Sequence, residues 1–196
     1  MRTLIAIPLV HTERDLASLS GEPFKSTDEV WSASRKMIAE LDRPYASIRL
    51  YQDALPLCER EPDIVKEIAA RGSKNHQFLL ELMAQGARLV GTEDPDLLLQ
   101  EYQFLQHALG GREHGAENHR ENQRLLSRRD RFIAGRINAT LAAGEIGLLF
   151  LGPAHSVEPF LDADIQVKQL FRSLQERPLN AEPAERPARP DPTPPR

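Results

Sequence analysis

Short apolar runs alternate with longer amphipathic stretches along most of this 196-residue chain. The apolar runs predict strands at residues 3–10, 46–51, 87–90 and 146–151, with a weaker fifth strand at 164–167. Between these runs, apolar residues recur at three- and four-residue spacing, which is the pattern of helices that bury one face. This spacing predicts helices over residues 26–41, from 62 to a stop at 72, from 74 to 83, 95–109 and 116–143.

Several of these helices begin with recognisable signals. Ser26 and Glu29 form an S-x-x-E capping box, in which the two side chains satisfy backbone N–H groups at the helix start. Pro62 suits the first turn of a helix, and Asp94 followed by Pro95 has the character of an N-cap and a first helical residue. The helix positions are therefore supported by local chemistry as well as by periodicity.

The alternation of strands and helices predicts an α/β fold. Strands that are separated by helices need crossover connections, so the sheet is expected to be mostly parallel, with four to five strands flanked by helices. The continuous apolar run at 146–151 indicates a sheet that is covered on both faces. We expect one domain over residues 1–176. In such open sheets, ligands bind beyond the carboxyl ends of the strands.

The last twenty residues differ sharply from the rest. Residues 177–196 contain seven prolines and almost no side chain that a core could bury. Proline removes backbone donors and fixes φ, so we predict a disordered or polyproline-like tail. Docking of this tail to a proline-binding module is the alternative.

Composition excludes several classes of protein. The chain has 25 Lys and Arg against 29 Asp and Glu, for a net charge of −4, and 40% of its residues are apolar. A nucleic-acid partner is therefore not expected, because such domains are usually basic. Cys58 is the single cysteine, which excludes an internal disulfide and a cysteine-rich zinc module. The early apolar run at 4–10 is too short for a membrane helix or a signal peptide, so we predict a cytoplasmic protein without a membrane partner.

Candidate chemistry lies where the predicted strands end. His11 follows the first strand, Asp53 the second, Glu93 the third and His155 the fourth. Two imidazoles with one or two carboxylates suit a divalent metal such as zinc or manganese. They equally suit a metal-free pair, in which a carboxylate orients one imidazole as a base. In the structural alternative each residue serves only its own loop: Asp53 caps a turn and Glu93 is solvated.

The long predicted helix at 116–143 carries a second candidate feature. Arginines at 120, 124, 128 and 131 form a stripe at helical spacing. Such stripes are usually solvated faces, and a phosphate-binding ridge is the sharper interpretation. The sequence contains no G-x-x-x-x-G-K-[ST], no G-x-G-x-x-G and no G-x-S-x-G motif, so phosphate-loop, dinucleotide and nucleophile-elbow enzymes lack their signatures.

The stretch from 129 to 155, RDRFIAGRINATLAAGEIGLLFLGPAH, resembles the C-terminal signature of the TraB/GumN/Tiki group. That group lies within a wider set that includes erythromycin-esterase-like and ChaN-like proteins. In the group an arginine opens a helix that leads into an apolar strand ending in G-x-x-H, and Arg129, Gly152 and His155 match these positions. The group's first G-x-x-H corresponds to residues 8–11, where proline replaces glycine, and its glutamate after the second strand falls near Asp53.

The resemblance implies an α/β fold with a paired-histidine site, and metal-dependent hydrolysis in some members. Our leading hypothesis is therefore a hydrolase-like protein. His11 and His155 would hold a divalent metal or act as base, Asp53 or Glu93 would complete the site, and Arg129 would steady an anionic or carbonyl group of the substrate.

The substrate would be a small molecule or a peptide, and assembly with further copies of the chain stays open. Two alternatives belong to other classes. One is a non-enzymatic ligand-binding or regulatory domain, and the other is an assembly protein that packs its arginine-rich helix on a partner.

Overall fold

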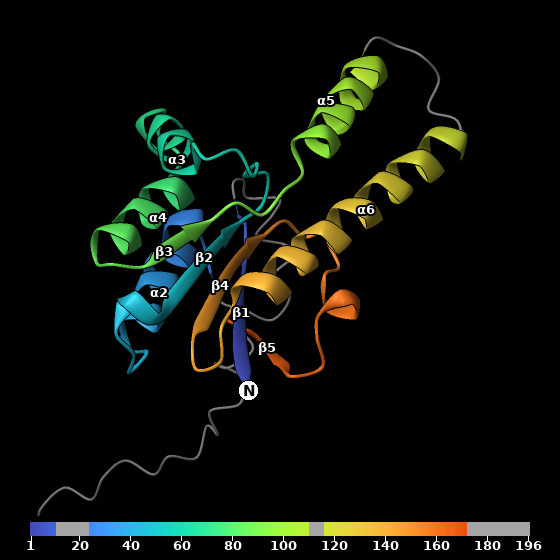
Figure 1. The fold of residues 1–196 in the computed structure, drawn as a ribbon. Helices are drawn as coiled ribbons and strands as arrows, with labels where there is room; N and C mark the ends of the chain where they lie inside the picture. The colour runs from blue at the N-terminus through green and yellow to red at the C-terminus, as the bar shows by residue number, and fades with distance from the viewer. Residues whose placement is uncertain (11–23, 110–115, 172–196) are drawn as a thin grey trace, which may run out of the picture.

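The computed structural model describes residues 1–10, 24–109 and 116–171 (Figure 1). Its strands are β1 (Arg2–Pro8), β2 (Ile48–Gln52), β3 (Arg88–Val90), β4 (Ile146–Leu151) and β5 (Ile165–Gln169). Its helices are α2 (Thr27–Ala39), α3 (Glu61–Ala70), α4 (Lys74–Ala84), α5 (Pro95–Leu109) and α6 (Ala116–Thr140), with short 3₁₀ turns at Tyr45–Ser47 and Glu158–Phe160. His11 and the predicted tail at 177–196 lie outside the described residues.

The five strands form one sheet in the order β3-β2-β4-β1-β5, and every pairing is parallel. This confirms the α/β prediction and extends it, since none of the paired strands is antiparallel. The carboxyl ends of all five strands therefore meet at one edge of the sheet. The strand order places β4 between β2 and β1, so segments distant in the sequence become neighbours at that edge.

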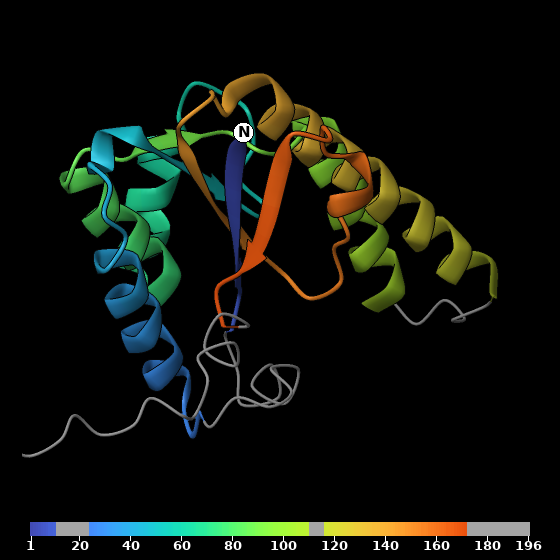
Figure 2. The ribbon, with the colours of Figure 1, turned by 90° about the horizontal axis from the view of Figure 1, so that it is seen from below.

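Helices cover both faces of the sheet (Figures 1 and 2). Helices α2, α3 and α4 lie on one face, and α6 lies on the other with α5 beside it. Neighbouring residues of a strand point to opposite layers, because side chains alternate along β-structure. Leu50 packs in the core beneath α2 and α4, whereas Tyr51 packs against α6. Leu149 is also buried on the α6 side, which explains why the 146–151 run is apolar throughout.

Local side-chain chemistry explains where the helices begin. The Ser26 hydroxyl accepts a hydrogen bond from the Glu29 N–H at 3.3 Å, as the capping box predicts. The Glu29 carboxylate instead accepts from the N–H of Lys25, one residue before the cap, at 2.7 Å. Asp94 accepts from the Asp96 N–H at 2.8 Å and so caps α5. The predicted starts are thus close to the observed ones.

Predicted element ends differ by a few residues. Strand β2 begins at Ile48 because residues 45–47 form a 3₁₀ turn. Helix α6 ends at Thr140 rather than 143, since the Glu145 carboxylate takes the Ala142 N–H at 2.9 Å and Gly144 has a φ of +83°. Both differences arise from competing local hydrogen bonds rather than from a different fold.

Helix α6 connects the core to the carboxyl edge of the sheet. Its C-terminal half packs on the sheet through Ile133 and Ile137, which have no exposed surface. Its N-terminal half continues beyond the sheet alongside α5 (Figure 1). Residues 129 and 130 lie where the helix passes the strand ends. None of the helices in the described ranges has the length and apolar content needed to cross a bilayer.

Candidate functional site

Asp53 stands at the carboxyl end of β2 and reaches across to β4. Its backbone N–H donates to the Phe150 carbonyl at 2.9 Å, which continues the parallel ladder by one residue. Its carboxylate accepts the Gly152 N–H at 3.1 Å. The next residue, Ala54, has a φ of +60° and turns the chain away from the sheet. The turn thus leaves the Asp53 carboxylate in the space between the two strand ends.

Glu93 follows β3 and is completely buried. Backbone bonds tie it to the loop after β2: its N–H donates to the Leu55 carbonyl at 3.0 Å, and its carbonyl accepts from Leu57 at 2.9 Å. The neighbouring Thr92 hydroxyl donates to the Gln52 carbonyl. Glu93 is therefore not a solvated loop residue, as one alternative from the sequence had it, because its carboxylate faces the interior of the protein.

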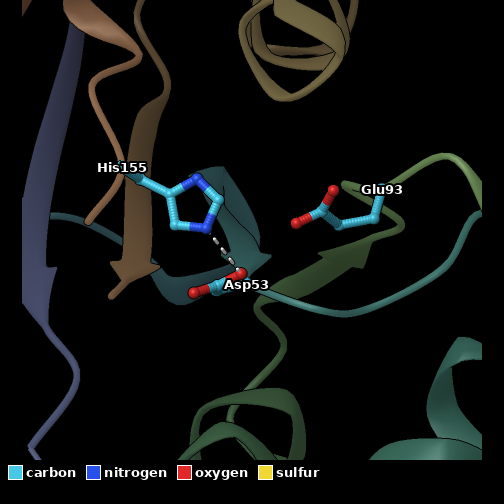
Figure 3. A group of neighbouring side chains, drawn as sticks. All are labelled: Asp53, Glu93 and His155. Atoms are coloured by element: carbon cyan, nitrogen blue, oxygen red, sulfur yellow. Dashed lines mark ion pairs between the residues drawn. The ribbon is translucent and has the colours of Figure 1, made fainter. Parts of the chain in front are cut away.

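His155 lies in the loop after β4, where its N–H donates to the Gly152 carbonyl at 3.2 Å. The ring nitrogen Nε2 of His155 lies 3.3 Å from Asp53 Oδ1. Figure 3 shows the three side chains of Asp53, Glu93 and His155 converging from three separate strand ends. The opposite ring nitrogen, Nδ1, lies 2.6 Å from Asp130 Oδ1.

Arg129 of α6 joins the carboxylates of the site. Its guanidinium donates twice to Glu93, at 3.2 and 2.6 Å, and once to Asp53 at 3.0 Å. A further N–H donates to Glu101 of α5. The side chain is 4% exposed. The guanidinium of Arg129 therefore binds carboxylates of the protein itself, whereas the prediction from the sequence was that it faces a substrate group.

The charges of this cluster do not balance. Asp53, Glu93, Glu101 and Asp130 supply four carboxylates, against the guanidinium of Arg129 and the imidazole of His155. Asp130 is as well buried as Arg129, and Glu93 is more so. Glu101 is 30% exposed and partly hydrated, whereas the other three carboxylates have little contact with solvent. Buried carboxylates without matching cations are costly, so the excess of negative charge favours a positively charged ligand.

The same environment moves pKa values in opposite directions. Burial raises the pKa of Glu93 above its ordinary value, although the ion pair with Arg129 opposes the rise. Burial would also raise the pKa of Asp53, but His155 and Arg129 outweigh it and hold that pKa below its ordinary value. Burial would lower the pKa of His155, yet its hydrogen bonds to Asp130 and Asp53 raise it to about 9. Such divergent shifts are typical of functional sites.

Asp53, Glu93 and His155 form a group that could hold a metal ion. One ligand atom from each residue lies within 4.8 Å of the other two. Two carboxylate oxygens and one imidazole nitrogen are a donor set that suits a divalent transition metal or zinc. With three protein ligands, a cation would keep coordination positions for water or substrate.

The structure brings together Asp53, Glu93, Arg129 and His155, four of the five residues singled out in the sequence. His11, the fifth, lies outside the described residues. Sequence reasoning missed Asp130 and Glu101. Asp130 directly follows Arg129 in the sequence, but nothing in the helical pattern distinguishes its carboxylate from the other charges of α6.

The arginine stripe of α6 divides into different environments. Arg128 donates to Gln100 of α5 at 3.0 Å, and Arg131 lies over the Phe160 ring at 4.6 Å. Arg120 and Arg124 are exposed. The stripe therefore contributes contacts within the protein as well as a solvated face.

Comparison of the chain with protein-family models, with curated proteins and with solved structures finds no match. The resemblance to the TraB/GumN/Tiki group thus stays a prediction from its motifs.

Proposed function

We propose that this chain is a metal-dependent hydrolase whose divalent cation binds Asp53, Glu93 and His155. The observation that carries the proposal is the convergence of these three ligands at the carboxyl edge of a parallel sheet. That edge is where open α/β folds place their ligands.

The charge balance supports a cation at this position. With His155 protonated, the four carboxylates exceed the positive groups by two charges. A divalent cation that displaces the proton from Nε2 leaves an excess of only one. Zinc and manganese both accept mixed oxygen and nitrogen ligands, so these are the metals we expect.

The residues of the chain would prepare the site before any cation arrives. Arg129 holds the Glu93 carboxylate through two hydrogen bonds and the Asp53 carboxylate through one. The Gly152 N–H fixes the second oxygen of Asp53. When bound, the metal would activate a water molecule and polarise the bond to be hydrolysed. His11 stays a predicted second imidazole.

Metal uptake tests the proposal directly. Calorimetry on chelator-treated protein should show binding of one Mn²⁺ or Zn²⁺ per chain, with affinity at least tenfold lower in His155→Gln and in Asp53→Asn. His119→Gln is the matched control, because that histidine is exposed, is hydrogen-bonded to Gln123 and is not one of the three candidate ligands. A wild-type chain that takes up neither metal contradicts the proposal.

A second measurement separates a hydrolase from a simple metal-binding domain. The metal-loaded chain is assayed against a panel of activated esters, amides and phosphate esters. We expect turnover of one class, its loss on chelation, and its loss in Asp53→Asn. Metal uptake without turnover of any class would leave the ligand-binding hypothesis in place of the enzyme.

A metal-free acid–base site is the second candidate function. The observation in its favour is the His155 ring, which lies between two carboxylates, Asp53 and Asp130. A histidine held in this way is suited to proton transfer. Turnover that survives chelation and is lost in His155→Gln would favour this candidate over the metal-dependent one.

A further inference from the structure

Asp130 is a buried carboxylate that the sequence analysis did not single out. It is 4% exposed, and both of its oxygens are engaged. Oδ1 lies 2.6 Å from His155 Nδ1, and Oδ2 accepts the Ser156 N–H at 3.1 Å. One side chain therefore holds both the ring of residue 155 and the backbone of the loop that carries it.

These contacts determine which ring nitrogen of His155 carries hydrogen. An ionised carboxylate only accepts hydrogen bonds, so Nδ1 must be the donor toward Asp130. Nε2 lies on the opposite side of the ring, 3.3 Å from Asp53 (Figure 3). The nitrogen that faces the candidate ligands is thus the one that can lose its proton and bind a cation.

Helix α6 supplies Asp130 together with Arg129. Consecutive residues of a helix diverge by about 100°, and the two side chains reach different candidate ligands: Arg129 contacts Asp53 and Glu93, whereas Asp130 contacts His155. The following turns of α6 are anchored in the core. A single rigid element therefore fixes the orientation of all three ligands.

We propose that Asp130 is a positioning residue that keeps His155 protonated at Nδ1 and directs Nε2 toward the cation. The protonation of Nδ1 is independent of the proposed metal site. The direction of Nε2 toward the cation rests on that proposed function. Carboxylates that orient metal-binding histidines commonly change metal affinity 10- to 100-fold when they are removed. A purely structural carboxylate would change stability and leave the affinity unaltered.

The test compares Asp130→Asn with Glu145→Gln. Glu145 is a matched control because it also pairs with a cationic side chain, Arg49, and accepts a backbone N–H, that of Ala142. It precedes β4 and so lies at the opposite end of the strands. Zn²⁺ affinity, measured by competition with a chromogenic chelator, should fall at least tenfold in Asp130→Asn and stay within twofold of wild type in Glu145→Gln.

Proton NMR of the metal-free chain gives a readout that is independent of zinc. The charge-assisted bond to Asp130 should place the Nδ1–H of His155 at low field and slow its exchange with water. This resonance should vanish in Asp130→Asn and persist in Glu145→Gln. Asp130→Glu retains a carboxylate and should restore part of both the resonance and the Zn²⁺ affinity, which keeps the test valid if Asp130→Asn fails to fold.

The outcomes separate the two proposals. If wild type binds Zn²⁺ and Asp130→Asn binds it equally well, the positioning role is overturned and the metal site stands. If wild type binds no Zn²⁺, the metal site is overturned, and the Nδ1–H resonance alone decides whether Asp130 orients the ring. Absence of that resonance from wild type overturns the inference.

Discussion

The two ends of the sheet both carry charged clusters, and the clusters differ in kind. At the amino end, Arg49 and Glu145 form a one-to-one pair through two bonds of 2.8 Å. Arg2 at the same end meets Asp162 and Asp164, which are about half exposed. At the carboxyl end, four carboxylates share one arginine and one histidine, with Glu93 and Arg129 almost wholly buried.

The difference separates a structural ion pair from a candidate site. A charge pair that only supports the fold can balance its charges or leave them in water, which keeps its cost small. At the carboxyl end the charges do not balance, and only Glu101, whose side chain is 30% exposed, keeps a substantial part of its surface in water. This environment raises the pKa of Glu93 and lowers that of Asp53. An arrangement that is costly for folding is expected where function requires it.

The largest contrast should come from removing the arginine at each end. Arg129→Met leaves buried carboxylates without their cation, and we expect a loss of about 3–5 kcal/mol in the free energy of unfolding. Arg49→Met removes the partner of a single, partly hydrated glutamate, Glu145, and should cost about 1 kcal/mol. Urea denaturation in metal-free buffer measures both losses, and equal losses would contradict the comparison.

The next effect concerns the pH dependence of stability. Because the pKa of His155 is raised to about 9 in the folded chain, its contribution is complete below about pH 6.5 and is lost as the pH rises through about 9. The free energy of unfolding of metal-free wild type should therefore fall by about 3 kcal/mol over that window. His155→Gln should lack this decline, and parallel pH profiles of the two chains would refute the assignment.

A smaller effect is expected at the strained turn beside Asp53. Ala54 has a φ of +60°, a conformation that costs an alanine about 1 kcal/mol and a glycine little. Ala54→Gly should therefore raise the melting temperature slightly. The comparison variant at the amino end is Ala142→Gly. Ala142 does not have a positive φ, so this change relieves no strain, and the greater freedom of glycine in the unfolded chain should lower the melting temperature. A loss in both variants would show that Ala54 is unstrained.

The smallest effect should be found at the exposed amino-end cluster. Asp164→Asn removes one partner of Arg2, but Asp162 keeps its bond to the guanidinium at 2.7 Å and solvent screens the remaining charge. The melting temperature should stay within the scatter of repeated scans. A clear drop would show that this end of the sheet also depends on its charges.

The order of elements follows from the sequence with little ambiguity. Periodicity and capping residues predicted each strand and helix to within a few residues, because these signals depend on interactions between neighbours in the chain. Ser26 and Asp94 illustrate this, since each caps its helix through contacts that span three residues or fewer. The errors at residues 45–47 and 141–143 also have local causes, in a 3₁₀ turn and a carboxylate that competes for a backbone N–H.

Part of the candidate site could also be inferred from the sequence. Asp53, Glu93 and His155 each follow a predicted strand, and parallel strands bring their carboxyl ends to one edge. The rule places these residues at the same edge. It does not say which strands are neighbours, so it leaves the distances between the side chains undetermined.

Only the tertiary structure decided those distances. The placement of β4 beside β2 brought the Asp53 carboxylate to Gly152 and His155, residues about a hundred positions further along the chain. The packing of α6 decided which of its many charges faces the strand ends, and so selected Arg129 and Asp130 over the exposed Arg120 and Arg124. Local patterns specify which face of a helix is apolar, whereas the part of the sheet that this face covers depends on contacts between elements that are distant in sequence.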